Sequence, residues 1–89
     1  MGRRYSVLVI DDEDATLTMF RLFLTAYGYD VNVAENGRIG VELVRTLEPD
    51  IVFTDLKMPE MDGFEVLKQI KKTNSQIRRK NRHWKLFNI

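Results

Sequence analysis

Two short apolar segments of the chain each end in aspartate. Residues 7–10 lead directly into Asp11 and Asp12, and residues 51–54 lead into Asp55. Mg²⁺ commonly binds through one or two carboxylates together with water and phosphate oxygens. A carboxylate held beside such a cation can attack a phosphoryl group as a nucleophile. These residues therefore predict metal-assisted phosphoryl transfer to an aspartate, provided that the fold brings the two segments together.

The hydrophobic pattern predicts the elements that must position these aspartates. The continuous aliphatic runs at residues 7–10 and 51–54 are typical of strands buried on both faces, and the alternation over residues 29–33 predicts a strand with one polar face. Apolar residues at spacings of three and four predict helices over residues 15–27, 38–47 and 64–71, the last with Asp62 as its N-cap. The resulting order, β-α-β-α-β-α, is typical of a parallel sheet with helices on both faces.

In such a sheet the ligand site lies beyond the carboxyl ends of the strands. If the first and third strands are neighbours, Asp11, Asp12 and Asp55 converge there. Two carboxylates roughly 4 Å apart repel by about 4 kcal/mol at an effective dielectric of about 20, so a bound cation is needed to compensate. Aspartates also cap helices, and for Asp14, next to the predicted helix start at Ala15, we favour a capping role, with Asp12 as the alternative cap. Two strands that deliver three aspartates to one edge favour a metal site for the others.

The composition is that of one small domain with an unusual C-terminal segment. The chain has 89 residues and no cysteine, which excludes a disulfide framework and a thiolate metal site. No apolar run approaches the roughly 20 residues that cross a bilayer, so we expect a cytoplasmic protein with no membrane partner. All 13 acidic residues lie in residues 1–72, whose net charge is −4, whereas residues 73–89 carry a net charge of +5. Two different compositions have been joined.

Three segments together resemble the receiver domain of two-component response regulators. They are Val7-Leu8-Val9-Ile10-Asp11-Asp12-Glu13, then Asn36-Gly37, and then Asp50-Ile51-Val52-Phe53-Thr54-Asp55-Leu56-Lys57-Met58-Pro59-Glu60-Met61-Asp62-Gly63. The combination is specific, and it covers residue 5 to about residue 76. The resemblance implies a flavodoxin-like (CheY-like) doubly wound parallel sheet with strand order 2-1-3-4-5. It also implies a phosphoacceptor module, which is not an enzyme beyond catalysing its own phosphotransfer and dephosphorylation.

The resemblance gives roles to individual residues. It implies that Asp55 accepts a phosphoryl group from a histidine kinase, while Asp12 binds Mg²⁺ directly and Asp11 binds it through water. The implied metal site consists of Asp11, Asp12, Asp55 and the backbone carbonyl of Lys57. The implied loop-shaping residues are Met58, Pro59 and Gly63, because proline fixes a φ angle and glycine permits an unusual one.

The resemblance fails after about residue 76. A receiver has five βα units, and this chain supplies three, so we expect an incomplete fold: a partial receiver domain at residues 1–76 and a basic, aromatic tail of non-family character at residues 77–89. The Ser or Thr that ends the fourth strand of the family, and the Lys that ends the fifth, are not found. A change of reading frame or an artificial replacement would give such a tail. We therefore expect impaired phosphorylation or, as an alternative, a self-associating structural fragment without signalling activity.

The missing units leave the third predicted strand with an open apolar edge. Such an edge pairs with other chains, so we expect a homodimer or a higher homo-oligomer, formed by pairing of third strands or by exchange of elements between chains. The residues predicted to take part are Ile51, Val52 and Phe53 of the strand and Trp84, Leu86, Phe87 and Ile89 of the tail.

The basic run at residues 77–84 is a second candidate site. Its arginines, its lysine and Trp84 can contact the phosphates and a base of a nucleic acid. A solvated tail is the plainer interpretation of such a run, and we favour it over polyanion or nucleic-acid binding. His83 is the single histidine of the chain, and it lacks the partners that catalysis or metal binding needs.

Overall fold

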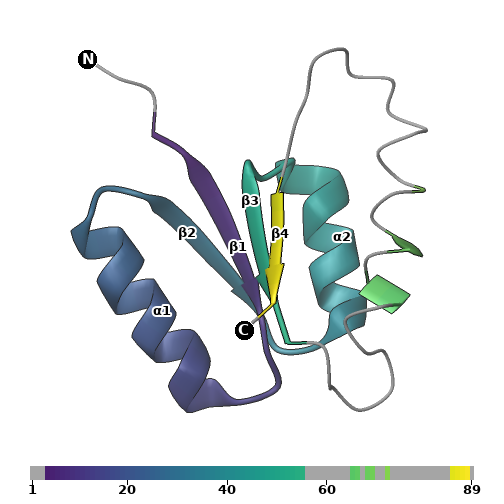
Figure 1. Cartoon of the computed structure of the whole chain (residues 1–89), viewed down its shortest axis with the longest axis horizontal. Coiled ribbons are helices and arrows are strands. Elements are labelled where there is room, and N and C mark those ends of the chain that lie inside the picture. The colour runs from purple at the N-terminus through teal and green to yellow at the C-terminus, as the bar shows by residue number, and fades with distance from the viewer. Residues whose placement is uncertain (1–3, 56–64, 67, 70–71, 73–84, 89) are drawn as a thin grey trace.

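The computed structural model describes residues 4–55, 65–66, 68–69, 72 and 85–88. In this part of the chain, four parallel strands form one sheet in the order β2-β1-β3-β4 (Figure 1). The elements are β1 (Ser6–Ile10), α1 (Asp14–Ala26), β2 (Asp30–Ala34), α2 (Gly37–Leu47), β3 (Ile51–Thr54) and β4 (Lys85–Asn88). Residues 65, 66, 68, 69 and 72 are also helical, at the position of the third predicted helix.

The central strand β1 is buried on both faces. Residues 7–10 are at most 1% exposed, because successive side chains point to opposite faces and a helix covers each face. Val7 and Val9 pack with Leu17 of α1, whereas Leu8 and Ile10 belong to the core on the α2 side. In Figure 1, α1 and α2 accordingly lie on opposite sides of the strands. The predicted doubly wound, flavodoxin-like sheet is confirmed, and its described part holds four strands of the five in that order.

The start of α1 differs by one residue from the prediction. Asp14 is the first helical residue and Glu13 is the N-cap, so the capping role expected for Asp14 is wrong. The Leu17 N–H donates to the Glu13 carbonyl at 3.1 Å, and this first intrahelical bond makes Glu13 the N-cap. The Glu13 N–H itself donates to the Asp11 carboxylate at 2.9 Å. The Glu13 side chain makes no capping bond to the backbone, and it accepts a bond from the Thr16 hydroxyl at 2.9 Å.

Close packing places α2 directly against β1. The Asn36 side chain caps the helix by accepting the Ile39 N–H at 2.8 Å. Gly40 lies so near Ile10 that a Cβ atom there would overlap the Cγ1 and Cδ1 atoms of the isoleucine. The glycine therefore sets the distance between α2 and the sheet. This contact fixes Ile10, the last residue of β1, immediately before the aspartates.

The tail contributes a strand to the sheet. β4 pairs with β3 in parallel, with Ile51 opposite Lys85 and Thr54 opposite Asn88. The expectation of an open β3 edge is wrong, because residues 85–88 of the same chain supply the backbone groups that this edge needs. On this side, β3 therefore has no free edge that could pair with the third strand of another chain.

Some of the residues predicted for self-association lie in described strands, and others lie outside the described part of the chain. Ile51, Val52 and Phe53 lie in β3, and they pair with a β4 that contains Leu86 and Phe87. Trp84 and Ile89 lie outside the described residues.

The helical residues after β3 complete the core on the α2 side. Val66 is 0% exposed and belongs to the same cluster as Val41 and Val44 of α2. Gln69 donates from its side-chain amide to Glu65 at 3.1 Å, which is the spacing of one helical turn. The predicted N-cap, Asp62, lies outside the described residues. In the described part, no helix has the length and apolar character to span a bilayer.

Candidate functional site

The carboxyl ends of β1 and β3 hold the first and last of the three aspartates. The Asp11 N–H donates to the carbonyl oxygen of Ala34 at 3.1 Å, and the Asp55 N–H donates to that of Ile10 at 3.1 Å. Each bond continues the ladder between parallel strands by one residue. The hydroxyl of Thr54, a fully buried residue, donates to the Asp55 carbonyl at 3.2 Å. The backbone of both aspartates is therefore fixed by the sheet.

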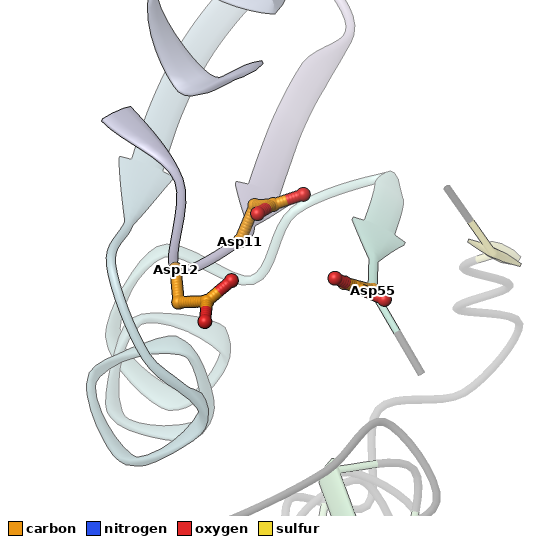
Figure 2. A group of neighbouring side chains, drawn as sticks. All are labelled: Asp11, Asp12 and Asp55. Atoms are coloured by element: carbon orange, nitrogen blue, oxygen red, sulfur yellow. The ribbon is translucent and has the colours of Figure 1, made fainter. Parts of the chain in front are cut away.

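The three carboxylates meet at this edge. One oxygen from each of Asp11, Asp12 and Asp55 lies within 4.8 Å of the other two. Figure 2 shows the side chains directed toward one another, with Asp11 and Asp12 leaving the end of β1 and Asp55 leaving the end of β3. Asp11 is buried, at 6% exposure, whereas Asp55 is half-buried and Asp12 is exposed. The structure thus brings together the three carboxylates that the sequence predicts.

Burial and charge act together on Asp11. Desolvation by burial is the largest effect and raises the pKa of its carboxyl above the usual value, and the negative charges of Asp55 and Asp12 raise that pKa further. The hydrogen bond from the Glu13 N–H opposes these effects and lowers the pKa. The net effect is a raised pKa of Asp11, so the folded protein destabilises the ionised form of this carboxyl.

A divalent cation fits this donor set. The described residues of the site offer carboxylate oxygens as ligands, which suit a hard cation such as Mg²⁺. A bound cation would also relieve the repulsion among the three carboxylates. Among the described residues, the side chains of Asp11, Asp12 and Asp55 can hold the ion. The remaining predicted members of the site, Lys57 with its carbonyl and the loop residues Met58, Pro59 and Gly63, lie outside the described residues.

An open pocket surrounds the carboxylates. Its volume is about 510 Å³, and the described residues that line it are Asp11, Asp12, Glu13, Thr16, Phe20 and Asp55. Thr16 and Phe20 are not among the site residues that the sequence predicts. Phe20 lies on the apolar stripe of α1, and that stripe predicts a core position. The ring of Phe20 does pack on Phe53, with centroids 5.5 Å apart, but the residue also reaches the pocket.

The basic run at residues 77–84, the other candidate site, lies outside the described residues. Polyanion binding through this run stays a prediction.

Comparisons with known proteins agree with this geometry. The family model of the response regulator receiver domain matches residues 7–79. Among curated proteins, the chemotaxis protein CheY of Thermotoga maritima is 44% identical over 73 residues, which cover 81% of this chain and 59% of that protein. The transcriptional regulatory protein ZraR of Klebsiella oxytoca is 41% identical over 76 residues, 85% of this chain and 17% of that protein.

A solved structure shows the same fold with its partner. In the co-crystal structure of the Saccharomyces cerevisiae histidine phosphotransfer signaling protein Ypd1 with the receiver domain of the response regulator Ssk1, the match has a TM-score of 0.78 at 25% identity. It covers 86% of this chain and 53% of that chain.

The chain spans less than two thirds of the length of these relatives. The family model nevertheless matches most of the chain, and the matched residues include Asp11, Asp12 and Asp55. The chain belongs to the family of response regulator receiver domains of two-component systems.

Proposed function

We propose that this receiver domain accepts a phosphoryl group on Asp55 with the help of Mg²⁺ held by Asp11, Asp12 and Asp55. The observation that carries the proposal is the convergence of the three carboxylates within 4.8 Å at the carboxyl edge of β1 and β3. Asp55 is the acceptor because it faces the other two from a separate strand and is half-buried. Asp11 is more deeply buried and already accepts the Glu13 N–H.

The reaction is an in-line displacement at phosphorus. An oxygen of the Asp55 carboxylate forms a bond to the phosphorus of a phosphohistidine, the P–N bond breaks, and its electron pair stays on the imidazole nitrogen. When bound, Mg²⁺ neutralises negative charge on the phosphoryl oxygens. The hydrogen bond from the Asp55 N–H to Ile10 holds the acceptor backbone in place during this step.

A histidine kinase or a histidine phosphotransfer protein is the donor that we propose. The similar Ssk1 receiver was solved together with the histidine phosphotransfer protein Ypd1, which supports this class of partner. In this role the chain is a phosphoacceptor and not an enzyme acting on other substrates. The cytoplasmic location, the domain boundary after residue 76 and the impairment of phosphorylation stay predictions.

Self-association also stays a prediction, in a narrower form. Because β4 pairs with β3 within the chain, the remaining route is an exchange of β4 between two copies, in which each β3 keeps the register of Ile51 with Lys85. Light scattering at micromolar concentration distinguishes the two cases. An exchanged dimer doubles the mass of the monomer, and a clean monomer removes this route.

Phosphorylation with a small donor tests the proposed function. Acetyl phosphate and Mg²⁺ should add one phosphoryl group to the chain, as seen by intact-mass spectrometry, and Asp55→Asn should abolish the addition. The matched control is Asp14→Asn, which removes the same charge from an exposed residue of a neighbouring groove outside the carboxylate pocket. Equal phosphorylation of Asp55→Asn and the wild type would rule out Asp55 as the acceptor.

A further inference from the structure

The carboxylate pocket has a second wall that the acceptor chemistry does not use. Of the described residues that line it, Asp11, Asp12, Glu13 and Asp55 are acidic, whereas Thr16 and Phe20 belong to α1. A cation and the three phosphoryl oxygens belong beside the carboxylates. The side chains of Thr16 and Phe20 are uncharged, so this part of the described lining suits a part of the phosphoryl donor that carries little charge.

Phe20 is held in a fixed relation to the acceptor. Its ring packs on that of Phe53 with centroids 5.5 Å apart and planes tilted by 36°. Phe53 lies in β3, opposite Val9 of β1 and two residues before Asp55. Phe20 is half-buried, so one part of the ring contacts the core while another part lines the pocket. An aromatic surface is thus positioned beside the reacting carboxylate by packing alone.

We infer that Phe20 is a specificity-determining residue, which contacts the leaving group of the phosphoryl donor and makes the pocket prefer a planar ring, such as imidazole. The inference rests on the proposed function, since it concerns the donor of the same transfer. In an in-line displacement the leaving group departs on the side of phosphorus away from the attacking oxygen, so it must occupy pocket volume that the acidic wall does not take. Aromatic pairs in tilted or offset geometry are favourable beyond the area that they bury.

Two small donors isolate the contribution of the ring. In N-phosphoimidazole, the Asp55 oxygen bonds to phosphorus, the P–N bond breaks with its electron pair on nitrogen, and neutral imidazole leaves because its other nitrogen carries a proton. In phosphoramidate, the same P–N bond breaks and the protonated nitrogen leaves as ammonia. The bond that breaks is of the same type in both donors, and only the first leaving group has a ring for Phe20 to contact.

The ratio of kcat/KM for the two donors is the readout. Phe20→Leu and Phe20→Met should lower the preference for N-phosphoimidazole over phosphoramidate by about three- to tenfold, mainly through KM, because a ring contact present in both ground and transition state is lost. Phe20→Tyr should retain the preference. The matched control is Phe23→Leu on the same helix, which is 60% exposed and outside the pocket lining, and it should leave the ratio unchanged.

The ratio also separates this inference from a general loss of structure. A variant that is merely less folded reacts more slowly with both donors and keeps the ratio. Wild-type protein that reacts with both donors, together with unchanged ratios in Phe20→Leu and Phe20→Met, overturns the inference and leaves the proposed function standing. Wild-type protein that reacts with neither donor overturns the proposed function and the inference together.

Discussion

The backbone N–H of Asp55 donates to the carbonyl oxygen of Ile10 at 3.1 Å, and this bond joins the end of β3 to the end of β1. Ile10 is fully buried and is followed by Asp11 and Asp12. The three carboxylates therefore occupy their positions because two buried strands end in register at one edge of the sheet. The core holds the site together, while charge repulsion within the site opposes its formation.

Removing the charge of Asp11 should stabilise the protein in the absence of divalent cations. Asp11→Asn relieves the burial of a charge beside Asp55 and Asp12, so its free energy of unfolding without metal should exceed that of the wild type in urea denaturation at neutral pH. The same variant should weaken Mg²⁺ binding by about 10- to 100-fold, measured by titration calorimetry. If Asp11→Asn is less stable than the wild type in the presence of a chelator, repulsion among the carboxylates does not destabilise the metal-free protein.

The pH dependence of this difference follows from the raised pKa of Asp11. A carboxyl whose pKa in the folded state lies above its unfolded value contributes stability that is fully present below the unfolded value and is lost as pH rises through the folded value. The advantage of Asp11→Asn over the wild type should therefore shrink as pH falls from neutrality toward the ordinary carboxyl range. Urea denaturation of both proteins across this pH range measures the difference in their free energies of unfolding. If the advantage of Asp11→Asn grows on acidification, the pKa of Asp11 is not raised in the folded protein.

Gly40→Ala should destabilise the protein although alanine favours helices. The added Cβ overlaps Ile10, and overpacking of this kind costs about 1–3 kcal/mol, which exceeds the gain of about 0.5–1 kcal/mol from replacing a helical glycine. Ile10→Val removes the Cδ1 atom that the new Cβ meets. In a double-mutant cycle the two changes should cost less together than the sum of their separate costs, and strict additivity would show that the contact is unimportant.

Asp50 ties β3 to β1 at the other end of the strands. Its carboxylate accepts the Ser6 N–H at 2.8 Å, and its own N–H donates to the Ser6 carbonyl at 2.8 Å. Asp50→Ala removes the first bond and should lower the free energy of unfolding by about 1–2 kcal/mol, whereas Asp50→Asn keeps an acceptor oxygen and should cost less. Asp30→Ala, at an exposed position of β2, should remain within about 0.5 kcal/mol of the wild type. Equal stability of Asp50→Ala and Asp30→Ala would exclude this role.

Prolines in β4 should uncover the edge of β3. Successive N–H groups of a strand point to opposite sides, so of Leu86→Pro and Phe87→Pro one removes a group that faces β3 and the other does not. Hydrogen exchange of the β3 amides should therefore accelerate strongly in one variant and little in the other, and the first should also self-associate in light scattering. Leu86→Val and Phe87→Val, which retain the N–H, are the controls. Unchanged exchange in both proline variants would refute the pairing of β4.

The sequence predicts the part of the fold that hydrophobic period and turn residues determine. Strands β1 and β3 and helices α1 and α2 form close to the predicted residues. The prediction that β3 is buried on both faces is wrong, because Ile51 and Phe53 are only half-buried. Ile39 and Leu47 of the α2 stripe are exposed, and the buried side chains of that helix are Val41 and Val44. The convergence of Asp11, Asp12 and Asp55 follows from the parallel order, because both strands end at the same edge.

Features that depend on tertiary pairing could not be predicted in the same way. The basic and aromatic tail has no clear period, and its short strand forms because β3 offers an unpaired ladder to the residues that reach it. Phe20 has the spacing of a core residue, and only the three-dimensional arrangement shows that one side of its ring lines the pocket. The helix starts at Asp14 because the Glu13 carbonyl accepts the Leu17 N–H, and the apolar spacing alone does not distinguish this start from one at Ala15.

Locating the phosphoryl group within the chain shows whether Asp55 is the phosphoacceptor. Wild-type protein is treated with acetyl phosphate with Mg²⁺ or with chelator, and the modified residue is identified by peptide mass spectrometry. We expect one phosphoryl group, on Asp55, formed only when Mg²⁺ is present. A phosphoryl group on another residue, or equal modification of Asp55 in chelator, would contradict it.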